Sequence, residues 1–235
     1  MKSVRVHRSD LPAGIAALPV RTRLIRPHDD LVSLVEQAVT GIARPGDVIA
    51  VSETAVAIAQ GQSVAAEYVR PSRVAYALSR RAGALATVSQ PESLQIVIDR
   101  AGMPRVLYAA CMHVLGRLAG RRGAFYEILG EEIAAIDGYT GTMPPFERNI
   151  VFAPQQPDAF AQSVFERTGI DCAVVDANDL EKAKVLGASA RTARRSVEIA
   201  LLSNPHGNGD EQTPIVVLKW RGTGANPLLE QAPAC

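Results

Sequence analysis

The sequence predicts an α/β protein of mixed α+β type, in which helices flank a mixed sheet. Short apolar runs alternate with stretches of helical periodicity, and several of the helical stretches begin at Pro and end at Gly. A chain of 235 residues that is 47% hydrophobic can also bury a sizeable core. Two arrangements remain open for residues 1–222: a single unit, or two interleaved subdomains. Residues 223–235, rich in Gly, Pro and Ala, predict a loosely held tail.

The first part of the chain predicts a helix followed by two strands. The apolar residues of segment 31–42 recur at intervals of three and four, which is typical of an amphipathic helix, and two aspartates precede it at the positive end of its dipole. The run DVIAVSE at 47–53 predicts a short buried strand. VAIAQG at 56–61 predicts a second strand that ends at a glycine.

The middle of the chain is mostly helical by its pattern. PSRVAYALSRRAG at 71–83 and PESLQIVIDRAG at 91–102 each begin with Pro and end at Gly. The stretch 103–122 fits either a helix or a strand followed by a loop. EEIAAIDGYTG at 131–141 predicts a strand that enters a Gly-rich turn, and RNIVFAP at 148–154 predicts another strand.

The last part of the chain again alternates. Segment 155–169 has one apolar face at helical spacing, and the strand CAVVD at 172–176 follows it. Two further helices are predicted, DLEKAKVLG at 179–187 and ARTARRSVEIALLSNP at 190–205. TPIVVLKW at 213–220 predicts a last buried strand.

Composition narrows the possible functions. The 25 Lys and Arg residues nearly balance the 24 Asp and Glu residues, so no net charge draws the chain to nucleic acid or to an acidic membrane surface. The three cysteines are far apart and form no CxxC pair, which argues against a zinc site or a disulfide framework and favours a reducing compartment. The N-terminus lacks the apolar block of a secretory signal, and no run approaches the roughly 20 apolar residues of a membrane span. We therefore expect a cytoplasmic protein.

Acidic residues stand where two predicted strands end. Asp137 and Asp176 each follow an apolar run, at the position where open α/β sheets bind ligands. Together with Asp179 they would suit a hard divalent cation, Mg²⁺ or Mn²⁺, which takes oxygen ligands and bridges to phosphate. Asp179 has an alternative role of equal weight as the N-cap of the helix predicted after it. For Asp176 we favour the ligand role over a turn role.

The stretch HGNGDEQTPIVV suggests a possible anion site before the last strand. Gly207 and Gly209 make a turn whose backbone N–H groups can approach an anion, and Glu211 and Thr213 lie just before the strand. The stretch matches neither GxxxxGK[ST] nor GxGxxG, so an ordinary helix-to-strand loop is at least as good an interpretation. The histidines have no metal-binding spacing, and no GxSxG nucleophile motif is present.

Five blocks follow one another along the chain: IRPHDDLVSLVEQAV, RPGDVIAVSETAVAIAQG, RPSRVAYALSRRAG, EIAAIDG and PDAFAQSVFERTGIDCAVVDAND. Their order resembles the family of glutamate ligases that elongate the deazaflavin coenzyme F-420. In that family a GDDL-type helix precedes a GDxxVxxxKxVSxxEG segment, one Asp follows an Ala-rich strand, and a second Asp closes a strand that begins with G[VI]. The likeness runs over most of the chain up to about Ser189.

The resemblance implies a homodimeric α/β ligase that binds GTP and a divalent metal. GTP would phosphorylate a carboxylate of the coenzyme precursor, and the amino group of L-glutamate would attack the acyl phosphate. Carried over by position, Asp137 and Asp176 would be metal ligands and Ser52 would belong to the nucleotide site. The partners would then be small molecules: a nucleotide, an amino acid and a carboxylate acceptor.

The chain also departs from the family pattern. Glu53 and Thr54 stand where a Lys region is expected, and Gln60 replaces the acid before Gly61. After the second Asp the ligases read DTFGRPWR, whereas this chain reads DANDLEKAKVLGAS. Two hypotheses follow. The first is a divergent ligase, with the family's substrates or with another acceptor or amino acid. The second is a non-catalytic regulatory protein that keeps the fold and binds a nucleotide or metal. We favour the enzyme because polar residues gather at the predicted strand ends.

Overall fold

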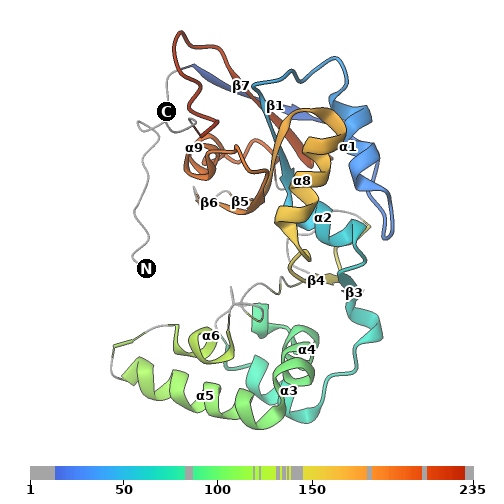
Figure 1. Cartoon of the computed structure of the whole chain (residues 1–235). Coiled ribbons are helices and arrows are strands. Elements are labelled where there is room, and N and C mark those ends of the chain that lie inside the picture. The colour runs from blue at the N-terminus through green and yellow to red at the C-terminus, as the bar shows by residue number, and fades with distance from the viewer. Residues whose placement is uncertain are drawn as a thin grey trace. The chain divides into compact units, whose positions relative to one another are not determined.

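The chain forms two units, which the computed structural model shows in Figure 1. The sheet unit comprises Met1–Gly61 together with Pro154–Cys235, and the helical unit comprises Gln62–Ala153. The structure describes residues 14–82, 87–118, 120–121, 123–130, 133, 136, 138, 145–178, 182–207 and 211–230.

A five-stranded mixed sheet forms the centre of the sheet unit, as the sequence predicts. Its strand order is β1-β7-β2-β5-β6. Strands β2 and β5 run parallel, and the other neighbouring pairs run antiparallel. The bounds are β1 Ile15–Val20, β2 Val48–Ser52, β5 Asp171–Asn178, β6 Lys182–Ala188 and β7 Ile215–Trp220.

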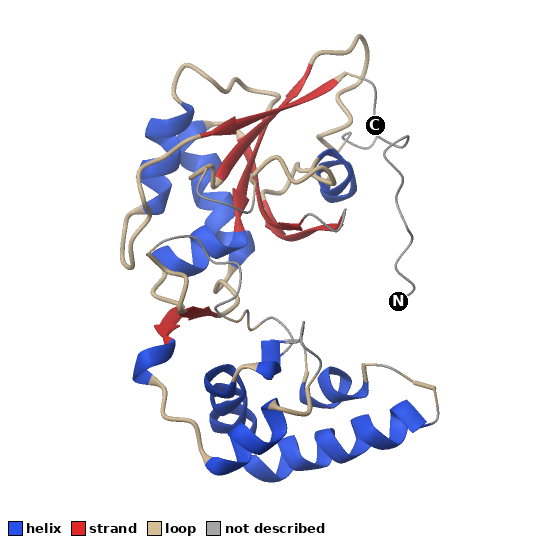
Figure 2. Cartoon of the chain, turned by 180° about the vertical axis from the view of Figure 1, so that it is seen from behind, coloured by secondary structure: helices blue, strands red, loops and turns tan. Residues whose placement is uncertain are grey.

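The central strands are buried on both faces because helices cover both sides of the sheet (Figure 2). On one face, side chains of β2, β5 and β7 pack with Val197 and Leu201 at helix α9. Helix α8 packs on β5, helix α2 lies against β2 and β5, and helix α1 packs on α8. Continuous apolar strands are typical of such covered sheets. The helix bounds are α1 Leu31–Val39, α2 Glu53–Ala59, α8 Pro157–Thr168 and α9 Arg194–Ala200.

The predicted start and stop signals act as expected in two of these helices. Asp30 is the N-cap of α1 and accepts hydrogen bonds from the Ser33 amide at 3.1 Å and the Ser33 hydroxyl at 2.6 Å, which lower the pKa of its carboxyl group. Helix α8 begins with Pro157 and ends at Gly169, whose φ of +71° is the left-handed conformation that glycine adopts without strain.

The helical unit consists of a two-stranded sheet and a group of short helices. Strands β3 and β4 pair antiparallel. The helices bury a cluster that includes Leu94, Val97, Val106 and Leu129. The bounds are β3 Ser63–Ala65, η2 Ala66–Tyr68, α3 Arg73–Ser79, η3 Thr87–Ser89, α4 Pro91–Ala101, α5 Met103–Leu118, α6 Ala124–Leu129 and β4 Asn149–Val151.

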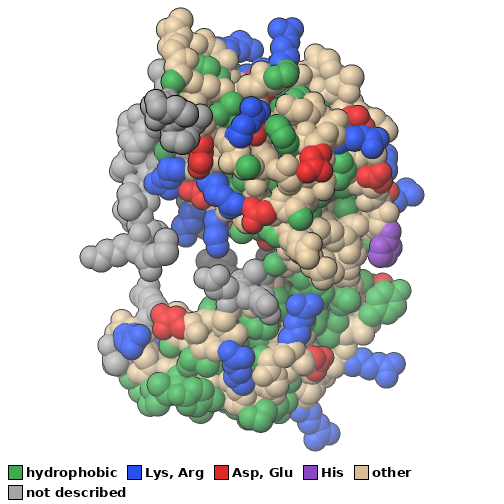
Figure 3. Space-filling view, viewed as in Figure 1, with side chains coloured by type: hydrophobic (Ala, Val, Ile, Leu, Met, Phe, Trp, Pro, Cys, Tyr) green, Lys and Arg blue, Asp and Glu red, His purple; other side chains and the backbone are tan. Residues whose placement is uncertain are grey.

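Helix α5 is unusual because much of its apolar surface faces solvent. Only Val106 and Ala109 are classed as buried among its described residues. Figure 3 shows hydrophobic side chains gathered on the surface of the helical unit. Five large apolar side chains of α5 contribute exposed area, namely Leu107, Tyr108, Val114, Leu115 and Leu118. None of the helices in the described part of the chain combines the length and apolar character that a membrane span requires.

Two predicted elements are wrong. The segment 56–61, predicted as a strand, contains the end of helix α2 and its C-cap. The prediction failed because Ala55–Ala59 are all buried, so the sequence shows no helical period there. The predicted helix at 179–187 is instead strand β6, which pairs antiparallel with β5. The ambiguous stretch 103–122 is helix α5 over most of its length. Most of the strand predicted at 131–141 lies outside the described residues, and Ile133 within it is helical.

Candidate functional site

The parallel pairing of β2 and β5 brings two of the predicted site residues to one edge of the sheet. In the register of the two strands Ser52 lies beside Val175, so Asp176 is the next residue along β5 at the same edge. The segments below them are fully buried, from Val48 to Val51 and from Asp171 to Val175. The core therefore fixes the backbone from which both side chains start. We call this edge the carboxyl edge.

Strand β7 enters the sheet at the carboxyl edge because it runs antiparallel to β2. Its first residue, Ile215, pairs with Val51, and the Ser52 amide donates to the carbonyl of Pro214 at 2.8 Å. Thr213 is the next residue back along the chain, so this third predicted residue also belongs to the edge. The topology thus brings Ser52 to two segments that are both distant from it in the sequence.

Asp176 lies beside the lysines of β6. Lys184 is its partner in the antiparallel register, and Lys182 is the partner of Asn178. The side chain of Asp176 reaches solvent, yet neighbouring protein removes part of its water and raises the pKa of the carboxyl group, while the charge of Lys184 acts in the opposite sense. A cation placed at this carboxylate would favour its ionised form.

The loop before β7 is held by a pair of contacts between two residues. His206 Nδ1 lies 3.1 Å from the Thr213 carbonyl oxygen, and the Thr213 hydroxyl donates to the His206 carbonyl oxygen. Between them, Gly207 has a φ of +74°, and an added Cβ would lie only 2.8 Å from Glu211 Cδ. The Glu211 carboxyl group therefore packs directly over Gly207. The backbone of Gly207 faces this carboxyl group, which disfavours the binding of another anion there.

His206 is a feature of the edge that the sequence pattern did not single out. Its side chain is 9% exposed, and Nε2 has no hydrogen-bond partner among the described residues. Burial lowers the pKa of the imidazole to about 4, so the ring is neutral at pH 7, with its proton on Nδ1 toward the Thr213 carbonyl. The spacing of the four histidines in the sequence does not reveal this burial, because it depends on how the loop around His206 folds.

Basic residues also flank the carboxyl edge, one on each side of the sheet. Strand β1 leaves the sheet there, since Val20 pairs with Ile215 and the Thr22 amide donates to the Gln212 carbonyl at 3.0 Å. Arg21 follows β1 and is exposed. With Lys184 it supplies positive charge on both sides of the central strands, which a bound phosphate would require.

The described residues do not by themselves make a metal site. They contain no group of three or more His, Cys, Asp or Glu side chains that could hold a metal ion. Of the three predicted ligands only Asp176 is described, and Asp137 and Asp179 lie outside the described residues, as does Gly209. The interpretation of Asp179 as the N-cap of a helix is wrong, because the segment that follows is strand β6. The carboxylate of Asp176 is the type of donor that Mg²⁺ and Mn²⁺ prefer.

Gln60, which stands where the related ligases carry an acid, has a structural role here. Its amide nitrogen donates to the Gln155 carbonyl at 2.9 Å, and its amide oxygen accepts from the Gln155 backbone amide at 2.7 Å. The carboxamide thus joins the end of α2 to the segment before α8. A carboxylate could only accept, so it could make one of these two hydrogen bonds.

A search of curated proteins found no match to this chain. A comparison with family models, in contrast, agrees with the resemblance in the sequence. A family model described as F420-0:Gamma-glutamyl ligase matches residues 19–179, which is more than half of the chain. The match includes Ser52 and Asp176 and ends before the loop that carries Gly207 and Thr213. The chain therefore belongs to the F420-0:gamma-glutamyl ligase family.

Proposed function

We propose that the chain is a nucleotide- and metal-dependent ligase that adds L-glutamate to a deazaflavin coenzyme precursor or a related carboxylate acceptor. Its membership of the F420-0:gamma-glutamyl ligase family supports glutamate ligation. The observation that carries the proposal is the arrangement of the carboxyl edge, where Ser52 and Asp176, both inside the family match, adjoin Thr213. Ligands of open α/β sheets bind at such an edge.

The proposed reaction activates a carboxylate and then replaces the activating group. The γ-phosphoryl group of GTP passes to the acceptor carboxylate, the glutamate nitrogen forms a bond to the acyl carbon, and the acyl–phosphate bond breaks. GDP, inorganic phosphate and a proton are released. A divalent cation held by Asp176, with Asp137 and Asp179, would neutralise phosphate oxygens.

Residues of the carboxyl edge have roles that follow from their chemistry. Arg21 and Lys184 would balance the charge of the nucleotide phosphates, and the Ser52 and Thr213 side chains would contribute to the nucleotide site. Positioning and electrostatic stabilisation are the main contributions that a protein makes to phosphoryl transfer. We further propose that the active form is a homodimer, as the resemblance implies, and that it is cytoplasmic, as the cysteine usage and the N-terminal sequence led us to expect.

A non-catalytic function is the second candidate, and Gln60 is the observation that favours it. Both polar groups of its side chain hydrogen-bond to Gln155, and a carboxamide lacks the negative charge that the family's acid would bring to the site. A protein that keeps the fold and binds a nucleotide without turnover would tolerate this replacement of the family's acid. Such a protein would sense the nucleotide instead of consuming it.

An assay for product distinguishes the two candidates. The full chain is incubated with coenzyme F420-0, L-glutamate, and GTP or ATP, with Mg²⁺ or Mn²⁺, and the products are followed by mass spectrometry and by release of phosphate. We expect a product heavier by one glutamyl residue, formed only with a nucleotide, and its loss in Asp176→Asn. The control is Glu166→Gln, an exposed acid in the last turn of α8, which leads to the amino end of β5 and not to the carboxyl edge. Nucleotide binding with no product from wild type would favour the regulatory candidate.

A further inference from the structure

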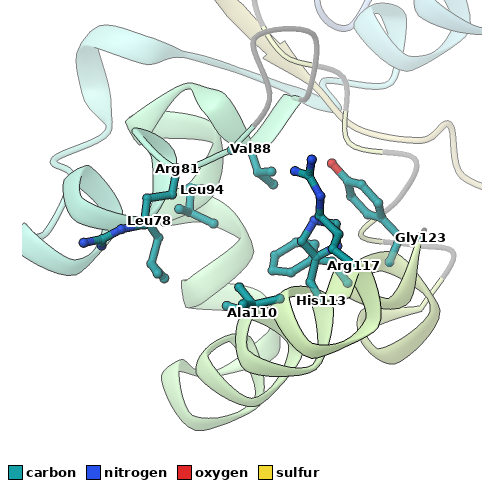
Figure 4. A pocket seen from close by; sticks show the side chains of 12 residues that line it. Leu78, Arg81, Val88, Leu94, Ala110, His113, Arg117 and Gly123 are labelled. Atoms are coloured by element: carbon teal, nitrogen blue, oxygen red, sulfur yellow. The ribbon is translucent and has the colours of Figure 1, made fainter. Parts of the chain in front are cut away.

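The helical unit contains a cavity of about 450 Å³ that the proposed ligase reaction does not use. This volume lies within the range of roughly 300–1,000 Å³ that small-molecule sites occupy. Helices α3, α4, α5 and α6 and the η3 turn enclose it (Figure 4). The residues that line it are Leu78, Arg81, Ala82, Val88, Leu94, Ala110, His113, Val114, Arg117, Gly123, Phe125 and Tyr126.

The wall of the cavity is mostly apolar. Val88, Leu94 and Phe125 belong to the buried core of the helical unit and turn part of their surface to the cavity. Phe125 and Tyr126 also pack edge to face, with ring centroids 5.3 Å apart, which fixes the aromatic part of the wall. An apolar ring of one or two cycles fits such a wall by size and by chemistry.

The described polar side chains that line the cavity include no acid. They are Arg81, His113, Arg117 and Tyr126. His113 and Arg117 are four residues apart on α5 and therefore share one face of the helix. In Figure 4 the side chain of Arg117 extends from α5 toward Val88.

No described acid pairs with the two arginines of the cavity. Within the described part of the chain neither Arg81 nor Arg117 forms an ion pair, and Arg81 Nη1 makes one long contact of 3.4 Å to the Ala77 carbonyl. Arginine stays charged at any pH at which proteins are folded, and its guanidinium binds a carboxylate or sulfonate through two parallel hydrogen bonds. Tyr126 adds a hydroxyl group, and the burial that raises its pKa keeps the phenol protonated and able to donate.

We propose that this cavity is a binding site for a small organic monoanion with an apolar, aromatic body. The body would lie against Val88, Leu94 and Phe125, and the anionic group would accept hydrogen bonds from Arg117 and His113. Among the described lining residues the arginines are not offset by an acid, which favours an anion over a cation or a neutral molecule. The apolar wall selects against a small, fully hydrated anion such as inorganic phosphate.

A fluorescent aromatic sulfonate tests the proposal on the full chain. Titration with 8-anilinonaphthalene-1-sulfonate should give saturable fluorescence at one site, and 2-naphthoate should displace the dye. The neutral analogue 2-naphthalenemethanol, with the same ring system, should displace it roughly tenfold less well, because it forgoes a charge-assisted hydrogen bond. Equal displacement by the two competitors would overturn the proposal.

Variants locate the dye. Arg117→Met should weaken binding roughly tenfold, and Ala110→Trp should abolish it by filling the cavity, whereas Arg80→Met, an exposed arginine outside the lining, should bind as wild type does. Circular dichroism and the unfolding midpoint of each variant show whether the fold is kept, and the competitor experiment on wild type needs no variant. Leu115→Gln removes an exposed apolar side chain on α5 outside the lining. If Leu115→Gln abolished binding while Arg117→Met and Ala110→Trp did not, the dye would occupy the outer surface of α5 and the proposal would be wrong. The same conclusion would follow if dye binding fell as copies of the chain associated with one another.

Discussion

Gly187 on β6 lies where the edge strand meets the start of helix α8, and its replacement by alanine gives a sharp test of this packing. An ideal Cβ at Gly187 would lie 2.2 Å from the Pro157 carbonyl carbon and 2.4 Å from the Asp158 amide nitrogen. Ordinary contacts begin at 3.4 Å, so the two segments must separate by roughly 1.2 Å. Both neighbouring atoms belong to the backbone, which has no rotamer by which to move aside.

The cost of this separation follows from known overpacking effects. Extra methylene groups in packed sites cost about 1–3 kcal/mol, and the upper end applies because backbone is displaced. With a change of roughly 2–4 °C in midpoint for each kcal/mol, the midpoint of Gly187→Ala should fall by about 6–12 °C. Movement of β6 would also disturb the hydrogen bond of 2.9 Å that the Ala188 amide donates to Asp158 Oδ1.

Differential scanning calorimetry measures the effect, with Gly116→Ala as the matched control. Gly116 lies inside helix α5, and an added Cβ would meet nothing closer than 3.7 Å. That variant should be unchanged or more stable by up to about 1 kcal/mol, because alanine favours the helix. If Gly187→Ala unfolded at the wild-type temperature, the close approach of β6 to α8 would be wrong.

Three further predictions concern stability, each measured by urea unfolding. Burial lowers the pKa of the His206 imidazole from 6.5 to about 4, so the stability contributed by the neutral ring is complete above pH 6.5 and is lost as the pH falls toward 4. Over this range wild type should lose up to about 3 kcal/mol relative to His206→Gln. Parallel pH profiles of the two proteins would contradict the burial. Arg191→Met should cost about 1–2 kcal/mol, because it removes the ion pair of the buried Asp171 carboxylate, which keeps its hydrogen bond from Ser189. The cost is less than for a fully buried pair because the Arg191 side chain is 57% exposed. Arg195→Met breaks an exposed pair and should change stability by less than about 0.5 kcal/mol, so equal effects of the two variants would refute the distinction. Gln60→Glu should cost about 1 kcal/mol, because the donor to the Gln155 carbonyl is lost, and no change would show that this hydrogen bond contributes nothing.

The elements that the sequence predicted correctly are those with a clear period or a continuous apolar run. Helix α1 shows its apolar face in the pattern, and the central strands β2, β5 and β7 are runs of buried residues bounded by polar loops. Pro and Gly mark both ends of α4, where Pro91 is the first residue and Gly102 has a φ of +84°. These signals are local, so no knowledge of neighbouring elements is needed to read them.

The two wrong elements depended on tertiary structure. Helix α2 is buried on every side, so its Val, Ile and Ala residues resemble a strand. Strand β6 contains good helix formers but gains its hydrogen bonds from β5, and pairing overrides propensity there. Its exposed Lys182 and Lys184 suit an edge strand, where lysine prevents pairing with other chains.

Only part of the candidate site could be predicted from the sequence, because some of its residues are brought together by tertiary structure. The rule that ligands gather at the carboxyl ends of strands led to Asp176, and the family resemblance led to Ser52. The parallel pairing of β2 and β5 brings the two residues to one edge. Thr213 joins them because β7 is antiparallel, which no local pattern revealed. The burial of His206 arises from the fold of its loop. The assignment of Asp137, Asp176 and Asp179 to a metal stays a prediction.

Thermal unfolding in the presence of nucleotides tests the central claim, that the carboxyl edge binds a nucleotide with a metal through Asp176. Wild type, Asp176→Asn and the control Glu166→Gln are unfolded with GTP, ATP or GDP, each with and without Mg²⁺ or Mn²⁺. A ligand at a hundredfold excess over its Kd stabilises the folded state by about 2.7 kcal/mol. We predict that a guanine nucleotide with metal raises the midpoint of wild type and of Glu166→Gln but leaves Asp176→Asn unchanged. If no nucleotide shifts wild type, or if Asp176→Asn shifts equally, the claim is contradicted.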